Sequence, residues 1–160
     1  MAKAMYDTIG GVHRKNKKLY ATIGSVHRKI KKAFDTVGGV HRQCFEDGIS
    51  ITIVGTINNS TYNGYATANV SGTTYNGATK STTITVPKGT VVSLYAKYGG
   101  YGAEIYEDGK NLKSSLADAN YNYTINKSVK ISLDMYTHQS IGPMGNPLYS
   151  YNGKIVITSL

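Results

Sequence analysis

The hydrophobic and polar positions of this chain follow two different patterns. From Met5 to Glu46 a fourteen-residue unit occurs three times without a gap, and its apolar residues recur at steps of three, four and seven. From Ile49 onward, apolar and polar residues alternate in short runs that are rich in Val, Ile, Thr and Tyr. This change of period predicts a repeat segment over residues 1–45 and a second domain over residues 46–160.

The repeat units share an aromatic residue, a threonine, a histidine and an arginine at fixed positions. They read MYDTIGGVHRKNKK, LYATIGSVHRKIKK and AFDTVGGVHRQCFE. The apolar steps formally fit a coiled-coil heptad, but a Gly-Gly or Gly-Ser pair interrupts each unit, and glycine costs a helix about 1 kcal/mol per residue. The same pairs between β-branched residues are typical of two-residue hairpin turns. The repeat is therefore predicted to form a meander of short hairpins, with a coiled coil as the alternative.

The glycine pairs define a register for these hairpins. Asp7 would lie opposite Arg14, and Asp35 opposite Arg42, so that opposite charges meet across the strands. The even period keeps one set of residues on one face in all three units. A small sheet with one apolar face must cover that face, so we predict a protein-interaction surface there. Its members are Arg14, Arg28, Arg42, Ile9, Val12, Ile23, Val26, Ile30, Val37 and Val40.

The second domain has the strand and turn signals of a β-sandwich. Alternating runs occupy residues 49–57, 64–70, 80–86, 90–97, 102–112, 121–126, 128–134 and 153–159. Turn signals occur at Asn63-Gly64, Asn76-Gly77, Pro87-Lys88-Gly89, Asp108-Gly109 and Asn152-Gly153. Seven or eight short strands at this spacing predict an antiparallel, immunoglobulin-like β-sandwich. The segment THQSIGPMGNP from Thr137 to Pro147 is predicted as a long loop.

Charge divides the chain at the same place. Residues 1–45 carry ten Lys and Arg against Asp7 and Asp35, a net charge of +8, whereas residues 46–160 carry eight Lys against seven acids, a net charge of +1. The repeat thus holds nearly all of the net charge of +9. Such a segment favours an anionic partner, either nucleic acid, a membrane surface or an acidic protein.

Motifs for catalysis, nucleotide binding and metal binding are not found in this sequence. We therefore predict a protein that is not an enzyme and needs no cofactor and no metal. His13, His27 and His41 are interpreted as polar strand residues beside threonine. Among the fourteen tyrosines, six lie near predicted turns and are candidate surface-contact aromatics: Tyr62, Tyr65, Tyr75, Tyr98, Tyr101 and Tyr149. Carbohydrate-binding sandwiches usually present tryptophan, which this chain lacks, so a glycan is the less favoured ligand.

The repeat, spelled aromatic-x-x-Ile/Val-Gly-Gly-Val-x-Arg-Lys-x-Lys-Lys, resembles the N-terminal repeats of small structural proteins in tailed phages and prophages of Gram-positive bacteria. The usual spelling there is close to GVGGVARKVKK, and this chain has His13, His27 and His41 in place of the alanine. The segments ITVPKGTVVSLYA, IYEDGKNL, YNYTINKSVKISL and GKIVITSL resemble the Tyr/Thr-rich β-sandwich that follows those repeats. The resemblance spans nearly the whole chain.

This resemblance implies a virion structural protein, made in the host cytoplasm and released by lysis. We expect a capsid decoration or head-fibre protein that is anchored by its repeats in many copies, with the sandwich facing outward and aiding adhesion. The expected partners are the major capsid protein or other virion proteins. The alternatives are a tail or baseplate protein that binds host surface glycans, and a nucleic-acid-binding protein that uses the basic repeat. No membrane partner is expected, because no run approaches the length of about 18 apolar residues that a span needs.

Overall fold

The computed structural model describes residues 6–9, 12–15, 19–23, 26–30, 32–37, 40–46 and 48–160, with side chains described from residue 48 onward. The chain divides into two compact units, Met1–Gly48 and Ile49–Leu160. Strands make up 62% of the residues, so the fold is all-β as predicted. No helix among the described residues is long and apolar enough to cross a membrane.

The described residues of the first unit form six strands. These are β1 (Tyr6–Ile9), β2 (Val12–Lys15), β3 (Leu19–Ile23), β4 (Val26–Ile30), β5 (Lys32–Val37) and β6 (Val40–Glu46). They pair antiparallel and two by two, as β1–β2, β3–β4 and β5–β6. The predicted turns at Gly10-Gly11, Gly24-Ser25 and Gly38-Gly39 lie outside the described residues and stay predictions.

The second unit contains ten strands and two short 3-10 helices. The strands are β7 (Ile49–Gly55), β8 (Ala66–Val70), β9 (Thr73–Asn76), β10 (Thr82–Val86), β11 (Val91–Ala96), β12 (Ala103–Glu107), β13 (Lys110–Ser115), β14 (Ala119–Thr124), β15 (Val129–Ile141) and β16 (Pro147–Ser159). The 3-10 helices are η1 (Asn63–Tyr65) and η2 (Pro143–Gly145). Each alternating run of the sequence overlaps a strand, although β13, β14, β15 and β16 extend beyond their runs, and β9 was not predicted.

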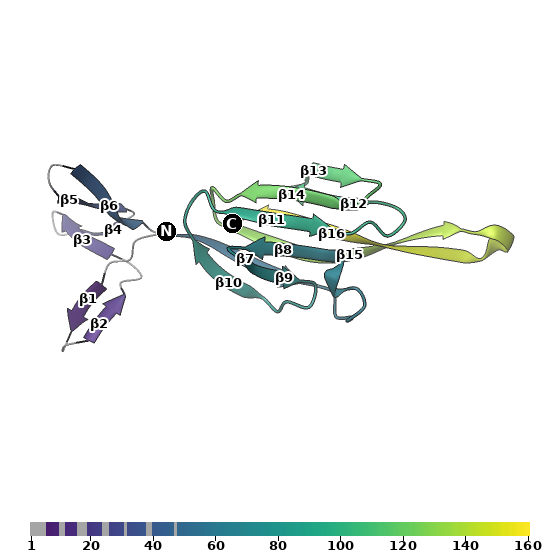
Figure 1. Cartoon of the computed structure of the whole chain (residues 1–160), viewed down its shortest axis with the longest axis horizontal. Coiled ribbons are helices and arrows are strands. Elements are labelled where there is room, and N and C mark those ends of the chain that lie inside the picture. The colour runs from purple at the N-terminus through teal and green to yellow at the C-terminus, as the bar shows by residue number, and fades with distance from the viewer. Residues whose placement is uncertain are drawn as a thin grey trace. The chain divides into compact units, whose positions relative to one another are not determined.

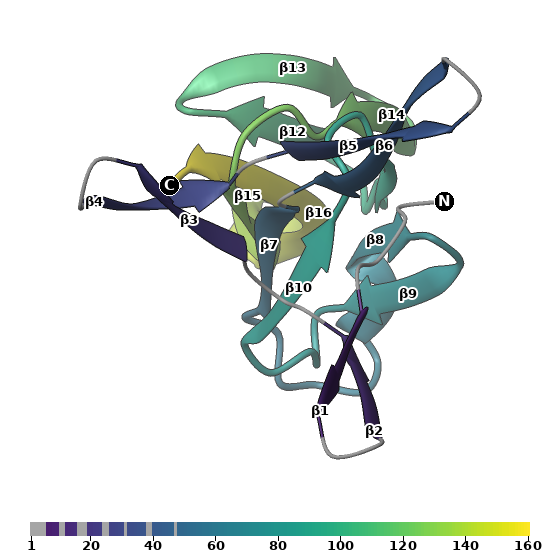
Figure 2. The ribbon, with the colours of Figure 1, turned by 90° about the vertical axis from the view of Figure 1, so that its left-hand side faces the viewer.

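These ten strands form two sheets (Figure 1). One has six strands in the order β10-β7-β15-β16-β12-β13, and Figure 2 shows β13 and β10 at its two ends. The other has four strands in the order β14-β11-β8-β9. One hydrophobic core contains side chains of both sheets. Its largest fully buried members include Ile51, Ile53, Leu94, Ile105, Ile131, Leu133, Ile155 and Ile157. Each contributes about 1.5–3 kcal/mol, so this unit has a core of its own.

The antiparallel pairing predicted for the sandwich is wrong at two ladders. β15 pairs with β7 in parallel, with Val129 opposite Ile51, and β12 pairs with β16 in parallel, with Ile105 opposite Ile155. Parallel neighbours are far apart in sequence, because a hairpin cannot connect them. The turn signals that suggest antiparallel neighbours therefore carry no information about these two pairs.

The turn predicted at Asn152-Gly153 is also wrong. Both residues lie inside β16, and Asn152 is fully buried. A Cβ at Gly153 would lie 1.9 Å from the carbonyl oxygen of Tyr65, so glycine is needed here for the close approach of two backbones. Asn-Gly marks a turn only where the chain reverses locally, and here long-range packing selects the same two residues. The turn predicted at Asp108-Gly109 is confirmed between β12 and β13.

The predicted long loop from Thr137 to Pro147 is likewise wrong. Thr137 to Ile141 continue β15, Pro147 begins β16, and only Gly142 to Asn146 form the turn. The polar residues in this segment favour a loop by composition, but a two-stranded ribbon without a core needs no apolar alternation. The ribbon extends past the ends of both sheets in the yellow-green part of Figure 1. We call Tyr136–Asn152 the β-arm.

Candidate interaction surface

For the repeat residues predicted to contact a partner, the structure gives the residue that lies opposite each one in the paired strand. Arg14 lies opposite Asp7, Arg42 opposite Asp35, and Arg28 opposite Ala21. The apolar candidates also face one another across the pairs: Ile9 with Val12, Ile23 with Val26, Val37 with Val40, and Ile30 with Leu19. Their side chains lie outside the described residues, so the predicted arginine-striped face stays a prediction.

The six candidate tyrosines do not form one patch. Tyr62 and Tyr65 lie together at η1, Tyr101 lies in the loop before β12, and Tyr149 lies on the β-arm, about half exposed. Tyr75 packs against the core. Tyr98 donates its backbone N–H to the carboxylate of Asp118 at 2.7 Å. At the base of the β-arm, Tyr62 contacts Tyr151 and Tyr101 contacts His138, and neither partner was a candidate from the sequence.

One face of the arm base is covered by tyrosines from η1. The ring of Tyr62 lies 4.7 Å from that of Tyr151 on β16 and 5.3 Å from that of Tyr65. The ammonium group of Lys97 lies 5.0 Å from the centroid of the Tyr65 ring, within the range of a cation–π contact. Burial, followed by the proximity of Tyr151, raises the pKa of Tyr62.

The other face of the arm base is covered by Tyr101. Its ring stacks on the imidazole of His138 at 3.5 Å between centroids, nearly parallel. The hydroxyl of Tyr136 donates to the carbonyl oxygen of Gly102 at 3.4 Å. Asn152 fixes the same loop, because its Oδ1 accepts from the N–H groups of Gly99, Tyr101 and Gly102 at 3.0–3.1 Å. The arm is thus clamped on both faces where it leaves the sheets.

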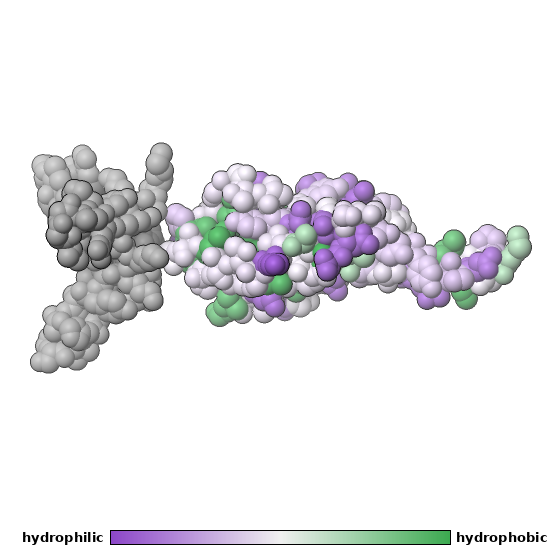
Figure 3. All heavy atoms as spheres, turned by 90° about the horizontal axis from the view of Figure 1, so that it is seen from below, coloured by the Kyte–Doolittle hydropathy of each residue, from purple (hydrophilic) through white to green (hydrophobic). Residues whose placement is uncertain are grey.

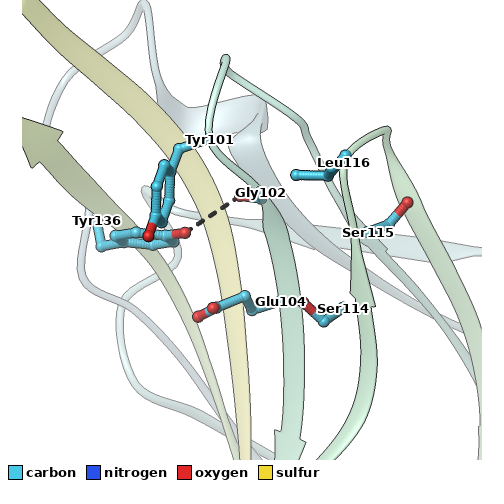
Figure 4. Close-up of a pocket in the computed structure, with 7 residues that line it drawn as sticks. All are labelled: Tyr101, Gly102, Glu104, Ser114, Ser115, Leu116 and Tyr136. Atoms are coloured by element: carbon cyan, nitrogen blue, oxygen red, sulfur yellow. Dashed lines mark hydrogen bonds between the residues drawn. The ribbon is translucent and has the colours of Figure 1, made fainter. Parts of the chain in front are cut away.

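A hollow of about 400 Å³ opens beside this clamp. The rings of Tyr101 and Tyr136 lie on one side of it, and Ser114, Ser115 and Leu116 line the other, with Glu104 between them (Figure 4). Burial, followed by the charge of Glu104, raises the pKa of Tyr136. The hollow therefore offers an exposed aromatic ring, a carboxylate acceptor and hydroxyl donors.

Beside the hollow, β12 and β16 carry a further tyrosine and a lysine. Lys154 on β16 places its ammonium group 5.3 Å from the ring centroid of Tyr106 and 5.9 Å from that of Tyr136. Burial and then Glu104 raise the pKa of Tyr106. Aromatic rings, a carboxylate and hydroxyl groups of this kind are suited to stacking and hydrogen bonding with a polar ligand.

The far end of the β-arm is apolar and exposed. Met144 is 96% exposed and Ile141 is 84% exposed, and Leu148 and Tyr149 are about half exposed. In Figure 3, a few green spheres at this end lie among lilac and purple ones. No Asp, Glu, Lys or Arg occurs between Asp134 and Lys154. Met144 has a positive φ of 62°, which is uncommon for a residue other than glycine.

Sequence reasoning missed most of this region for an identifiable reason. Tyr136, His138 and Tyr151 lie on strands, whereas from the sequence His138 was assigned to a loop and Asn152, next to Tyr151, to a turn. The absence of charge from Met135 to Gly153 is the one signal that the sequence itself offers for a distinct segment.

No protein-family model, no curated protein and no solved structure matches this chain.

Proposed function

We propose that this chain is a structural protein of a phage virion, not an enzyme, and that it is a capsid decoration or head-fibre protein. Residues 1–45 would attach to the major capsid protein, and residues 46–160 would be displayed outward as an immunoglobulin-like sandwich. The observation that carries this proposal is the charge division: a net charge of +8 resides in the repeat and +1 in the remainder. A segment with one strong charge beside a nearly neutral unit suits attachment by one end.

Two further observations support this division. The second unit has a core of its own, formed by side chains of both of its sheets. The pairs of Asp7 with Arg14 and Asp35 with Arg42 follow the predicted register, and the described strands form three separate two-stranded sheets instead of one continuous meander; on this proposal these strand pairs are the attachment element. A hairpin of this kind is marginal alone and gains stability when its apolar face is covered.

Binding to purified empty capsids tests the proposal. Full-length protein should co-sediment with capsids at moderate salt, and a variant that lacks residues 1–45 should not, although it keeps its β-sheet circular dichroism spectrum. Retention of the truncated protein at full occupancy would contradict the division of roles. Steep, salt-dependent retention of the full chain on DNA would instead support nucleic-acid binding by the repeat.

A second candidate function is glycan binding by a tail or baseplate protein. The hollow beside Tyr101 favours it, because a half-exposed aromatic ring, a carboxylate and serine hydroxyls converge there. The test is titration with cell-wall glycan fragments, comparing Tyr136→Phe with Tyr95→Phe. Both variants lose one tyrosine hydroxyl, but Tyr95 lies on β11 of the four-stranded sheet and donates its hydroxyl to Asp118. Equal affinities for the two variants would remove the hollow as a glycan site.

A further inference from the structure

The β-arm has one open strand edge. β15 pairs with β7 only from Val129 to Leu133, so in the part of the chain that the structure describes, Thr137–Ile141 pairs with β16 alone. The β16 side is less accessible: Pro147 has no N–H, and Gly99 lies so close to the carbonyl of Tyr151 that a Cβ there would be 1.5 Å away. The free edge is therefore that of Thr137–Ile141.

An open edge of this kind is normally protected. Native sheets protect their edges with charged residues, prolines or bulges, because unpaired N–H and C=O groups otherwise recruit another strand. Thr137–Ile141 contains none of these, and Thr137, Gln139, Ser140 and Ile141 are all exposed. A two-stranded ribbon is also marginal on its own, whereas four strands with an apolar face are stable. The arm thus lacks both edge protection and strand partners.

The geometry points to a second copy of this chain as the missing partner. We propose that two β-arms pair through their Thr137–Ile141 edges, antiparallel and centred on Gln139, to form a four-stranded ribbon. When two copies of this strand are related by a two-fold axis, they run antiparallel, and backbone N–H groups of one copy face C=O groups of the other. In this register Thr137 of one copy faces Ile141 of the other. Because Ile141 shares a face with Tyr149 and Tyr151 in the β15–β16 ladder, the apolar stripes of both arms join on one side of the ribbon.

The lack of charged residues in the arm permits a second copy to pair there. Two copies of a chain with a net charge of +9 repel each other, and the uncharged arm is a place where they can meet without opposing like charges. A lipid bilayer fits less well, because an unpaired strand edge is costly in hydrocarbon and the arm has no Lys or Arg for anionic headgroups. This inference does not rest on a virion location.

Sedimentation equilibrium of the full-length protein tests the pairing. We expect a monomer–dimer equilibrium at protein concentrations up to about 100 μM, since the contact is small. The dimer should strengthen when NaCl is raised to about 0.5 M, because salt screens the repulsion between the two basic chains. A wild-type protein that stays monomeric at every concentration and salt level would overturn the proposal.

Substitutions that place a charge on Gln139, the residue at the two-fold axis, test the contact directly. Gln139→Lys places two ammonium groups opposite each other and should raise the dissociation constant by about tenfold or more. Thr85→Lys adds the same charge on the exposed face of the edge strand β10 and should have little effect. Gln139→Glu alone should also dimerise poorly, and mixing it with Gln139→Lys should restore a mixed dimer.

The mixed dimer keeps the test informative even if one variant folds poorly. Restoration on mixing supports the edge pairing directly. A dimer that Gln139→Lys and Thr85→Lys weaken equally would place the contact elsewhere and overturn the assignment. Co-sedimentation of the wild type with neutral phosphatidylcholine vesicles, abolished by Gln139→Lys, would assign the arm to lipid instead and would equally overturn it.

Discussion

The side chain of Asn152 accepts a hydrogen bond from the backbone N–H of Gly102 at 3.0 Å, across the boundary between β16 and the loop that precedes β12. The same oxygen accepts from two further N–H groups of that loop, and the amide nitrogen donates to the carbonyl of Ser150 at 3.3 Å. One buried amide thus supplies the hydrogen bonds that a loop without secondary structure would otherwise lack. This arrangement fixes Tyr101 against His138 at the base of the β-arm.

Asn152→Ala should lower the free energy of unfolding by about 2–4 kcal/mol, because three loop N–H groups lose their acceptor. Urea unfolding followed by circular dichroism measures the change. Asn122→Ala is the control: its carbonyl accepts only from the exposed hydroxyl of Ser93, so the loss should stay within about 0.5 kcal/mol. Equal losses for the two variants would mean that water replaces the Asn152 amide.

Gly153→Ala should destabilise the second unit by about 3 kcal/mol, the upper end of the usual range for an overpacked core. The added Cβ would lie 1.9 Å from the Tyr65 carbonyl and 2.6 Å from the Lys97 nitrogen, and both are backbone atoms that cannot rotate away. Gly64→Ala, where nothing lies within 4 Å of the new Cβ, serves as the matched substitution in thermal unfolding. A similar small shift of the melting temperature in both variants would contradict the packing argument.

The free energy of unfolding should decrease at acidic pH, because Asp108 becomes protonated there. The hydroxyl and N–H of Ser159, and then Lys127, hold the pKa of this carboxyl below its usual value. A lowered folded-state pKa stabilises the fold above the unfolded pKa of about 3.9, and this contribution is lost as pH falls through the folded pKa. Asp108→Asn should therefore flatten the dependence of unfolding free energy on pH below about pH 4. Ser159→Ala should flatten it in the same direction, and curves parallel to that of the wild type would exclude this role.

Arg28→Lys should weaken attachment to capsids although the charge is kept. Arg28 lies opposite Ala21, so its register position supplies no carboxylate, and on the proposed function it would bond to a group of the partner protein. The planar guanidinium makes two directed hydrogen bonds that lysine cannot make. We expect a loss toward the lower end of about 2–5 kcal/mol in a capsid co-sedimentation titration. Lys18→Ala is the comparison, and equal small losses for both would indicate a diffuse basic patch.

The local features of the fold were predictable and the long-range ones were not. Alternation located most strands of the second unit, and Asp108-Gly109 was recognised because a tight turn depends only on neighbouring residues. The strand β9 was missed, since Thr73–Asn76 is short and lies between Gly72 and Gly77. Asn152 and Gly153 were misassigned, because Asn152 binds a loop about fifty residues earlier in the chain and Gly153 lies against the backbone of Tyr65 and Lys97.

The parallel ladder between β7 and β15 has a mechanical consequence. β7 begins at Ile49, and its five register pairs with β15 run from Ile51–Val129 to Gly55–Leu133, with the turn of the β-arm at the opposite end. Tension applied between Ile49 and Met144 acts along these strands, so it loads the hydrogen bonds of the ladder together in shear instead of opening them one after another. A molecule held at its repeat and pulled at its arm would carry that force through the five paired residues of this ladder.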